Sequence, residues 1–170
     1  MGAGKSYFAR QTLKFLRSKG RSARIISIAG KVKKVAATLT NTPISNFYCK
    51  KNKEWKYGIT NGKLLQILGQ GLFSLIDKRL WVDILIDKIN RTHEDIIIVD
   101  DLRYIHEFDA LNACTNIKLF HIHLISPFTR NDGRDTTHPS ETECEKIPAM
   151  LTIVNNRSQI DIAQVLKSII

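Results

Sequence analysis

The segment Gly2-Ala3-Gly4-Lys5-Ser6 decides the fold. It forms the second half of the phosphate-binding pattern G-x-x-x-x-G-K-[ST], whose backbone N–H groups surround nucleotide phosphates. In such a P-loop the lysine reaches the β- and γ-phosphates, and the serine hydroxyl binds Mg²⁺. The segment leads into an amphipathic pattern with Ala9, Leu13 and Leu16 on one face. We therefore expect a helix whose N-terminus faces a bound anion.

A second stretch, Ile96-Ile97-Ile98-Val99-Asp100-Asp101, supports this interpretation. A short apolar run that ends in acids is typical of a buried parallel strand, and such acids hold Mg²⁺ in P-loop proteins. The sequence therefore predicts nucleotide phosphate binding, with Ser6, Asp100 and Asp101 as metal ligands. Arg103 follows two residues later and is either a bidentate phosphate ligand, which we favour, or the partner of a neighbouring carboxylate.

The rest of the chain alternates between strand and helix patterns. Strands are expected at 23–28, 95–99, 118–125 and 151–154, and helices at 31–39, 64–68, 80–89, 108–114 and after Ser158, with Asp161 completing a capping box. This alternation predicts the α/β class with a mostly parallel sheet. The 170 residues, 43% of them hydrophobic, fit one domain with a real core.

The net charge of +10 is compatible with phosphorylated small molecules, with nucleic acid, or with surface lysines that only confer solubility. A segment at 48–57 interleaves lysines with aromatic residues, and this composition suits a nucleotide-base pocket and a single-strand platform equally. Its members are Tyr48, Lys50, Lys51, Lys53, Trp55, Lys56 and Tyr57.

Several classes of protein are disfavoured. No apolar run approaches the roughly 18 residues of a membrane span, so no membrane association is expected. The three cysteines Cys49, Cys114 and Cys144 are scattered, which argues against a disulfide framework and against a paired zinc site. A reduced, cytoplasmic location is therefore expected.

The ordered set of motifs resembles the phage-type deoxynucleoside monophosphate kinases of the P-loop nucleoside-monophosphate-kinase-like superfamily. The motifs, in chain order, are the P-loop at 2–6, the YGITNGKLLQ segment at 57–66, Trp81-Val82, Asp101-Leu102-Arg103-Tyr104 with Glu107, His138-Pro139-Ser140-Glu141, and Val154-Asn155 before the last helix. They extend over nearly the whole chain.

The resemblance implies a three-layer P-loop NTPase fold with a mostly parallel sheet, whose first strand is missing from this chain. It implies one kinase domain over 1–170, with an acceptor-binding helical segment at about 45–92 and a lid at about 126–146. Because that first strand is normally buried on both faces, we expect this form to be barely stable and to bind ATP weakly.

The resemblance also implies roles for individual residues. The donor nucleotide, ATP, would contact Gly2, Ala3, Gly4, Lys5, Ser6, Tyr7 and Asn155. The acceptor would contact Tyr57, Lys63, Gln66, Trp81, Arg103 and Glu141. Transfer itself would depend on Lys5, Arg103, Arg130 and Arg134, with Mg²⁺ held by Ser6, Asp100 and Asp101.

The expected activity is ATP-dependent phosphorylation of a deoxynucleoside monophosphate to the diphosphate, by in-line displacement. Two alternatives stay open: a non-catalytic nucleotide- or nucleic-acid-binding remnant of this fold, and a P-loop kinase for another small phosphorylated acceptor. The expected partners are small-molecule nucleotides rather than nucleic acid, and a homodimer is left open. Composition and motifs hint at a viral origin, which would place the protein in the host cytoplasm.

Overall fold

The computed structural model describes residues 3–128, 142–156 and 160–167. The chain forms two compact units. The first, which we call the P-loop unit, contains Met1–Ile26 and Arg91–Ile170, and the second, the helical unit, contains Ser27–Asn90. Most of the segment expected to bind the acceptor, at about 45–92, belongs to the helical unit. The expected α/β class with mostly parallel strands is confirmed.

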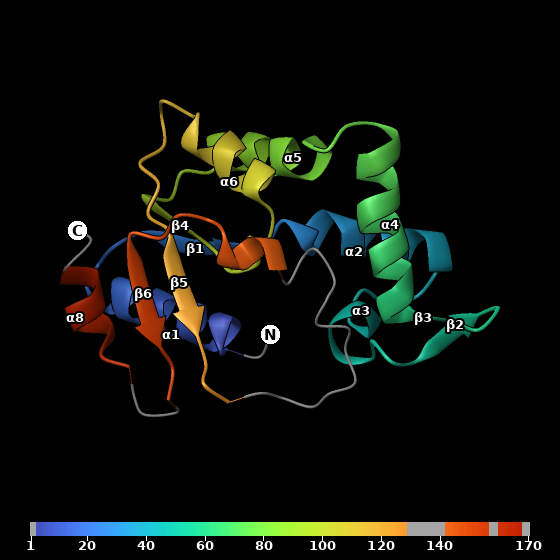
Figure 1. The fold of residues 1–170 in the computed structure, drawn as a ribbon, viewed down its shortest axis with the longest axis horizontal. Helices are drawn as coiled ribbons and strands as arrows, with labels where there is room; N and C mark the ends of the chain where they lie inside the picture. The colour runs from blue at the N-terminus through green and yellow to red at the C-terminus, as the bar shows by residue number, and fades with distance from the viewer. Residues whose placement is uncertain (1–2, 129–141, 157–159, 168–170) are drawn as a thin grey trace. The chain divides into compact units, whose positions relative to one another are not determined.

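The strands of the P-loop unit form two parallel pairs (Figure 1). The first pair joins β1 (Ala23–Ile26) to β4 (Ile96–Val99), and the second joins β5 (Ile122–Ile125) to β6 (Leu151–Val154). Strand β5 is shorter than the sequence predicted at 118–125. Its register places Ile122 opposite Leu151, so position 119 would face Pro148, which has no N–H to extend the ladder.

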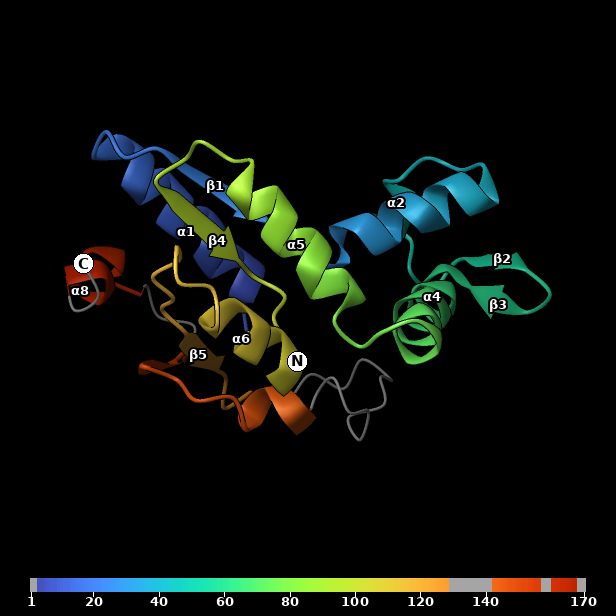
Figure 2. The same ribbon diagram turned by 90° about the horizontal axis from the view of Figure 1, so that it is seen from above.

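Helix α1 (Lys5–Ser18) packs against β1 and β4. Its apolar stripe was predicted, and Ala9 and Leu16 are indeed buried. Only four residues separate α1 from β1, and the two elements pack together, so they run antiparallel (Figure 2). The N-terminus of α1 therefore lies at the carboxyl ends of β1 and β4. This arrangement places the P-loop beside the end of the IIIV strand.

Three short helical elements complete the described part of the P-loop unit. They are α6 (Ile105–Asn112), the 3-10 turn η1 (Glu143–Glu145) and α8 (Ile162–Lys167). Helix α8 packs against α1. Ser158, the first residue of the expected capping box, lies outside the described residues. Asp161, expected as its second residue, directly precedes α8, and its Oδ1 atom accepts the Gln164 N–H at 3.0 Å.

The helical unit is built around one small apolar cluster. Its helices are α2 (Ala29–Thr40), α3 (Asn46–Cys49), α4 (Asn61–Leu75) and α5 (Leu80–Asn90). The side chains of Ala36, Phe47 and Leu64 form the buried cluster, and Trp55 packs against it while half-buried. Trp55 therefore contributes to the core of the helical unit. Other aromatic residues of the unit are exposed to solvent.

The basic segment at 48–57 is not the loop that the sequence predicted. It begins with the last two residues of α3 and ends just after β2 (Glu54–Lys56), which forms a hairpin with β3 (Ile59–Thr60). The hairpin turns at Tyr57 and Gly58, whose φ angles of 55° and 70° are both positive, as a type I′ turn requires. Tyrosine seldom adopts this conformation, so the Tyr-Gly pair was not recognised as a hairpin turn.

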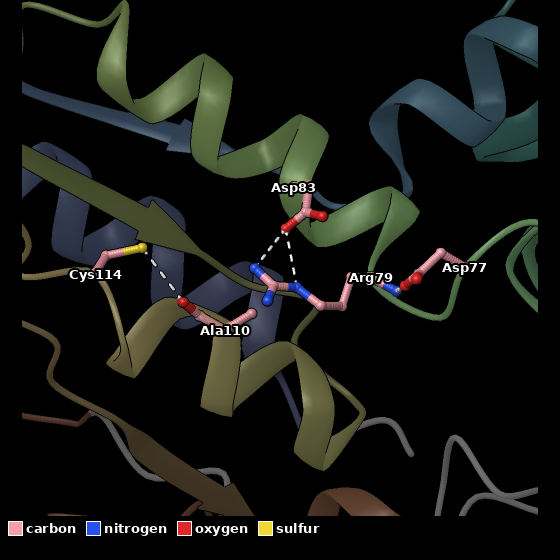
Figure 3. Close-up of polar contacts among 5 residues, drawn as sticks. All are labelled: Asp77, Arg79, Asp83, Ala110 and Cys114. Carbon is pink, nitrogen blue, oxygen red and sulfur yellow. Dashed lines mark hydrogen bonds and ion pairs between the residues drawn. The ribbon is translucent and has the colours of Figure 1, made fainter.

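Local side-chain bonds mark the start of α5 and the end of α6 (Figure 3). The Asp77 carboxylate accepts the Arg79 N–H at 2.7 Å, and the Arg79 guanidinium donates to Asp83 at 3.0 Å. The Arg79–Asp83 pair is exposed, so it adds little stability. After α6, Cys114 Sγ donates to the Ala110 carbonyl at 3.3 Å. Among the helices of the described ranges, none has the length and apolar character needed to cross a membrane.

Candidate phosphate-binding site

Gly4 determines the shape of the loop that leads into α1. Its φ of +86° lies in the left-handed region, where only glycine is unstrained. A Cβ built on Gly4 would lie 2.6 Å from Asn155 Nδ2, so a larger residue would also collide with that amide. The position therefore requires glycine for two independent reasons, one conformational and one steric.

Hydrogen bonds of Asn155 connect this loop to the β5–β6 pair. Asn155 follows β6, and its side-chain amide donates to the Ala3 carbonyl at 2.8 Å. Its backbone N–H donates to the Ile125 carbonyl at the end of β5, also at 2.8 Å. The expected place of Asn155 near the donor base stays a prediction, and in the structure its amide is bonded to the loop backbone. The P-loop thus lies at the carboxyl ends of β4, β5 and β6.

The first turn of α1 has backbone N–H groups with no partner among the described residues. Gly4 offers no side-chain cap, and the turn contains no acidic residue. The first intrahelical bond is donated by Phe8, and within the described ranges no group accepts the N–H groups of residues 5–7. These orphan donors, with the helix dipole, favour a phosphate at this end. Lys5 is half-buried there, while Ser6 and Tyr7 are exposed.

The predicted acidic pair lies at the same end of the unit. Asp100 and Asp101 directly follow β4, and both are half-buried, as is Arg103 two residues further on. Within the described residues no group of three or more His, Cys, Asp or Glu side chains could hold a metal alone. Mg²⁺ usually takes one or two carboxylates and completes its oxygen ligands with phosphate and water. Asp100, Asp101 and the Ser6 hydroxyl carry oxygen atoms of the kind that Mg²⁺ binds, and their role as metal ligands stays a prediction.

Sequence reasoning did not assign a role to Glu107, the buried acid of this region. Glu107 is only 6% exposed, and its Oε2 atom accepts the backbone N–H groups of Arg103 at 2.9 Å and Tyr104 at 3.1 Å. The pKa of Glu107 is raised to about 7, mainly by burial and to a smaller extent by the Asp101 charge, against the lowering effect of the two N–H groups and the Arg103 charge. The signal in the sequence was an acid three residues after Tyr104, the residue that directly precedes α6.

The acceptor residues expected in the helical unit differ in exposure. Tyr57 stands at the hairpin tip and is 88% exposed, and Lys63 and Gln66 are exposed one turn apart on α4. Trp81 is instead buried, and its indole Nε1 donates to the Gly69 carbonyl at 2.8 Å. This hydrogen bond joins α5 to α4.

Backbone bonds hold the lysine-rich turn of the helical unit in place. The carbonyls of Lys51 and Lys53 accept the N–H groups of Gly62 and Asn61 at the start of α4, at 2.8 and 2.9 Å. The buried Asn61 side chain also donates to the Lys50 carbonyl at 2.9 Å. With their backbone fixed in this way, the lysine side chains are exposed to solvent.

Four expected site residues lie outside the described residues: Gly2, Arg130, Arg134 and Glu141. They include both lid arginines. The expected site residues that the structure describes are the P-loop, the acidic pair, Arg103 and Asn155 in the P-loop unit, and Tyr57, Lys63, Gln66 and Trp81 in the helical unit.

Two comparisons with known proteins address the identity of the chain. The search of curated proteins found no match to this chain. A family profile described as "Deoxynucleotide monophosphate kinase" matches residues 7–165. The match begins after Ser6, so it rests on the chain beyond the P-loop residues and is independent of them. The chain belongs to the deoxynucleotide monophosphate kinase family.

Proposed function

We propose that this protein uses ATP and Mg²⁺ to phosphorylate a deoxynucleoside monophosphate to the diphosphate. The observation that carries the proposal is the uncapped N-terminus of α1 behind Gly4, in a chain of this kinase family. A helix end of this kind binds phosphate through N–H groups and needs no side-chain charge, and Lys5 adds a cation beside it.

Each of the other residues has a role in this scheme. The N–H groups of residues 5–7 and the Lys5 ammonium bind the donor phosphates, and Asn155 keeps the loop in place. Ser6, Asp100 and Asp101 would hold Mg²⁺, which neutralises charge on the phosphates during transfer. Arg103 offers a planar fork for the phosphate of the acceptor.

The acceptor nucleoside would meet the helical unit through Tyr57, Lys63 and Gln66. Tyr57 presents an exposed ring that can stack on a base. Lys63 and Gln66 supply a charge and an amide for its polar groups. The Trp81 indole N–H donates to the Gly69 carbonyl. Trp81 would therefore stabilise the packing of α5 on α4 rather than contact the nucleotide.

The test is a measurement of ADP release by the purified chain with Mg²⁺ and ATP, across the four common deoxynucleoside monophosphates and without acceptor. We expect ADP release to depend on a deoxynucleoside monophosphate and to match the diphosphate formed. ATP binding with no acceptor-dependent release would favour a binding protein instead. Release that depends only on a different phosphorylated acceptor would contradict the proposed substrate class.

A further inference from the structure

Glu107 is costly to bury. A carboxyl group that is 6% exposed loses most of its hydration, and the rise of its pKa to about 7 shows that two N–H bonds do not fully compensate. Capping a helix does not require this cost, because an exposed Ser, Thr, Asp or Glu caps equally well. Capping of α6 alone therefore does not explain why the Glu107 carboxyl group is buried.

The two bonds of Glu107 converge on one residue. The Arg103 N–H belongs to the peptide plane before the Arg103 Cα, and the Tyr104 N–H belongs to the plane after it. A single oxygen, Glu107 Oε2, accepts both, at 2.9 and 3.1 Å. Fixing both planes fixes φ and ψ of Arg103, and hence the direction in which its Cα–Cβ bond leaves the backbone.

This segment joins the acidic end of β4 to α6. It carries Asp100 and Asp101 at one end and Arg103 near the other, within five residues. If the segment between β4 and α6 were flexible, its backbone would have to become ordered each time Arg103 bound a ligand. The loss of backbone entropy would lower the affinity. A buried acceptor that holds the segment in advance removes that cost.

We propose that Glu107 is a positioning residue that aims the Arg103 guanidinium at the phosphate of the acceptor nucleotide. The inference rests on the proposed function, because it needs a phosphorylated acceptor. Glu107 itself does not touch the nucleotide. It acts through the backbone of Arg103, and its bond-accepting oxygen matters more than its charge.

The substitutions Glu107→Gln and Glu107→Ala separate these roles. Glutamine keeps a side-chain oxygen that can accept both N–H groups, whereas alanine removes it. We expect Glu107→Ala to weaken deoxynucleoside monophosphate binding about 10- to 100-fold, as for a misplaced binding group, with ATP affinity changed less than about threefold. Glu107→Gln should stay within about threefold of the wild type for both ligands. Asp109→Ala, at an exposed acid on the same helix, is the matched control.

Calorimetric titration with each deoxynucleoside monophosphate, and with ATP, gives these affinities without requiring turnover. A double-mutant cycle with Arg103→Ala then tests the pathway. If Glu107 acts through Arg103, Glu107→Ala should add almost no further loss in the Arg103→Ala background. Circular dichroism melting of each variant shows whether it remains folded, and Glu107→Gln supplies the folded comparison if the alanine variant does not.

Three results would overturn the inference. Unchanged acceptor affinity in folded Glu107→Ala is one, and additive losses in the cycle are another. Equal losses in Glu107→Gln and Glu107→Ala would mean that charge, rather than the accepting oxygen, is what matters. Failure of the wild type to bind or phosphorylate any deoxynucleoside monophosphate would instead overturn the proposed function, and this inference with it.

Discussion

The P-loop unit and the helical unit differ in the features that could attract phosphate. The P-loop unit offers backbone N–H groups at a helix end, with Lys5 and Arg103 beside them. The helical unit carries eleven Lys and Arg against four Asp and Glu, a net charge of +7 out of +10 for the chain. Oriented dipoles bind one phosphate in a defined place, whereas a broad positive surface raises the local concentration of any nucleotide.

The two units also differ in how they are stabilised. In the helical unit a buried cluster around Phe47 is continuous with packed helices. In the P-loop unit the four residues of β4 are only half-buried, although its apolar run is typical of a strand covered on both faces. Two-stranded sheets are marginal by themselves, so the helices packed on these strands supply much of the stability.

The largest expected effect concerns the acidic end of β4. Asp101→Asn should lower kcat about 10²- to 10³-fold with a much smaller change in KM, because the carboxylate acts on the metal as transition-state charge develops. Steady-state kinetics of Asp101→Asn and Asp100→Asn, with Asp109→Asn as control, would measure this. Full turnover in both Asp100→Asn and Asp101→Asn would remove this segment from the metal site.

A second substitution tests the division into two units. Phe47 is fully buried, so Phe47→Ala should destabilise the helical unit by about 3–5 kcal/mol. Hydrogen exchange should accelerate in α2, α3 and α4 while β1 and β4 keep their protection. Equal acceleration in both units would show that they unfold together.

The pH dependence of stability gives an effect of intermediate size. Because the Glu107 pKa rises from 4.5 to about 7 on folding, the folded protein keeps a proton that the unfolded chain releases between these values. The free energy of unfolding should therefore fall as pH rises from about 5 to about 8, by an amount on the order of 3 kcal/mol from this group.

Urea denaturation of the wild type and Glu107→Gln at several pH values isolates this contribution, because the other titrating groups are common to both. The wild type should lose stability relative to Glu107→Gln as pH rises. A constant difference between the two proteins would mean that the Glu107 pKa is the same in the folded and unfolded chains.

The smallest expected effect separates fold from function at the hairpin tip. Tyr57 adopts a φ of 55°, which asparagine tolerates better, so Tyr57→Asn should raise the stability of the helical unit by about 0.5–1 kcal/mol. If the ring stacks on the acceptor base, the same change should weaken deoxynucleoside monophosphate binding. Improved stability with unchanged affinity would exclude Tyr57 from the acceptor site.

Much of this architecture could be predicted because its signals are local and periodic. The stripe of Ala9 and Leu16 predicted α1, and the run ending at Val99 predicted β4 with its acids in place. Gly4-Lys5 predicted a glycine turn that leads into a helix, and the structure shows it, whereas phosphate binding at this helix end stays a prediction. These features depend on neighbours within a turn of helix or a few residues of strand.

Other features depend on contacts between distant residues. The bond from Asn155 to Ala3 spans nearly the whole chain, and no pattern near either residue predicts it. The burial of Trp81 depends in the same way on its bond to Gly69, twelve positions earlier. The hairpin was missed for a different reason, since its turn uses a tyrosine where asparagine or glycine is usual.

The most direct test of the account follows a labelled phosphate. The chain is incubated with Mg²⁺, ATP labelled at its γ-phosphate and a deoxynucleoside monophosphate, and the products are separated. We predict label in the deoxynucleoside diphosphate, and a rate at least about 10²-fold lower in Lys5→Ala, which loses a cation at the transferring phosphoryl group. Absence of label from every deoxynucleoside diphosphate with the folded, ATP-binding chain, or an equal rate in Lys5→Ala, would contradict it.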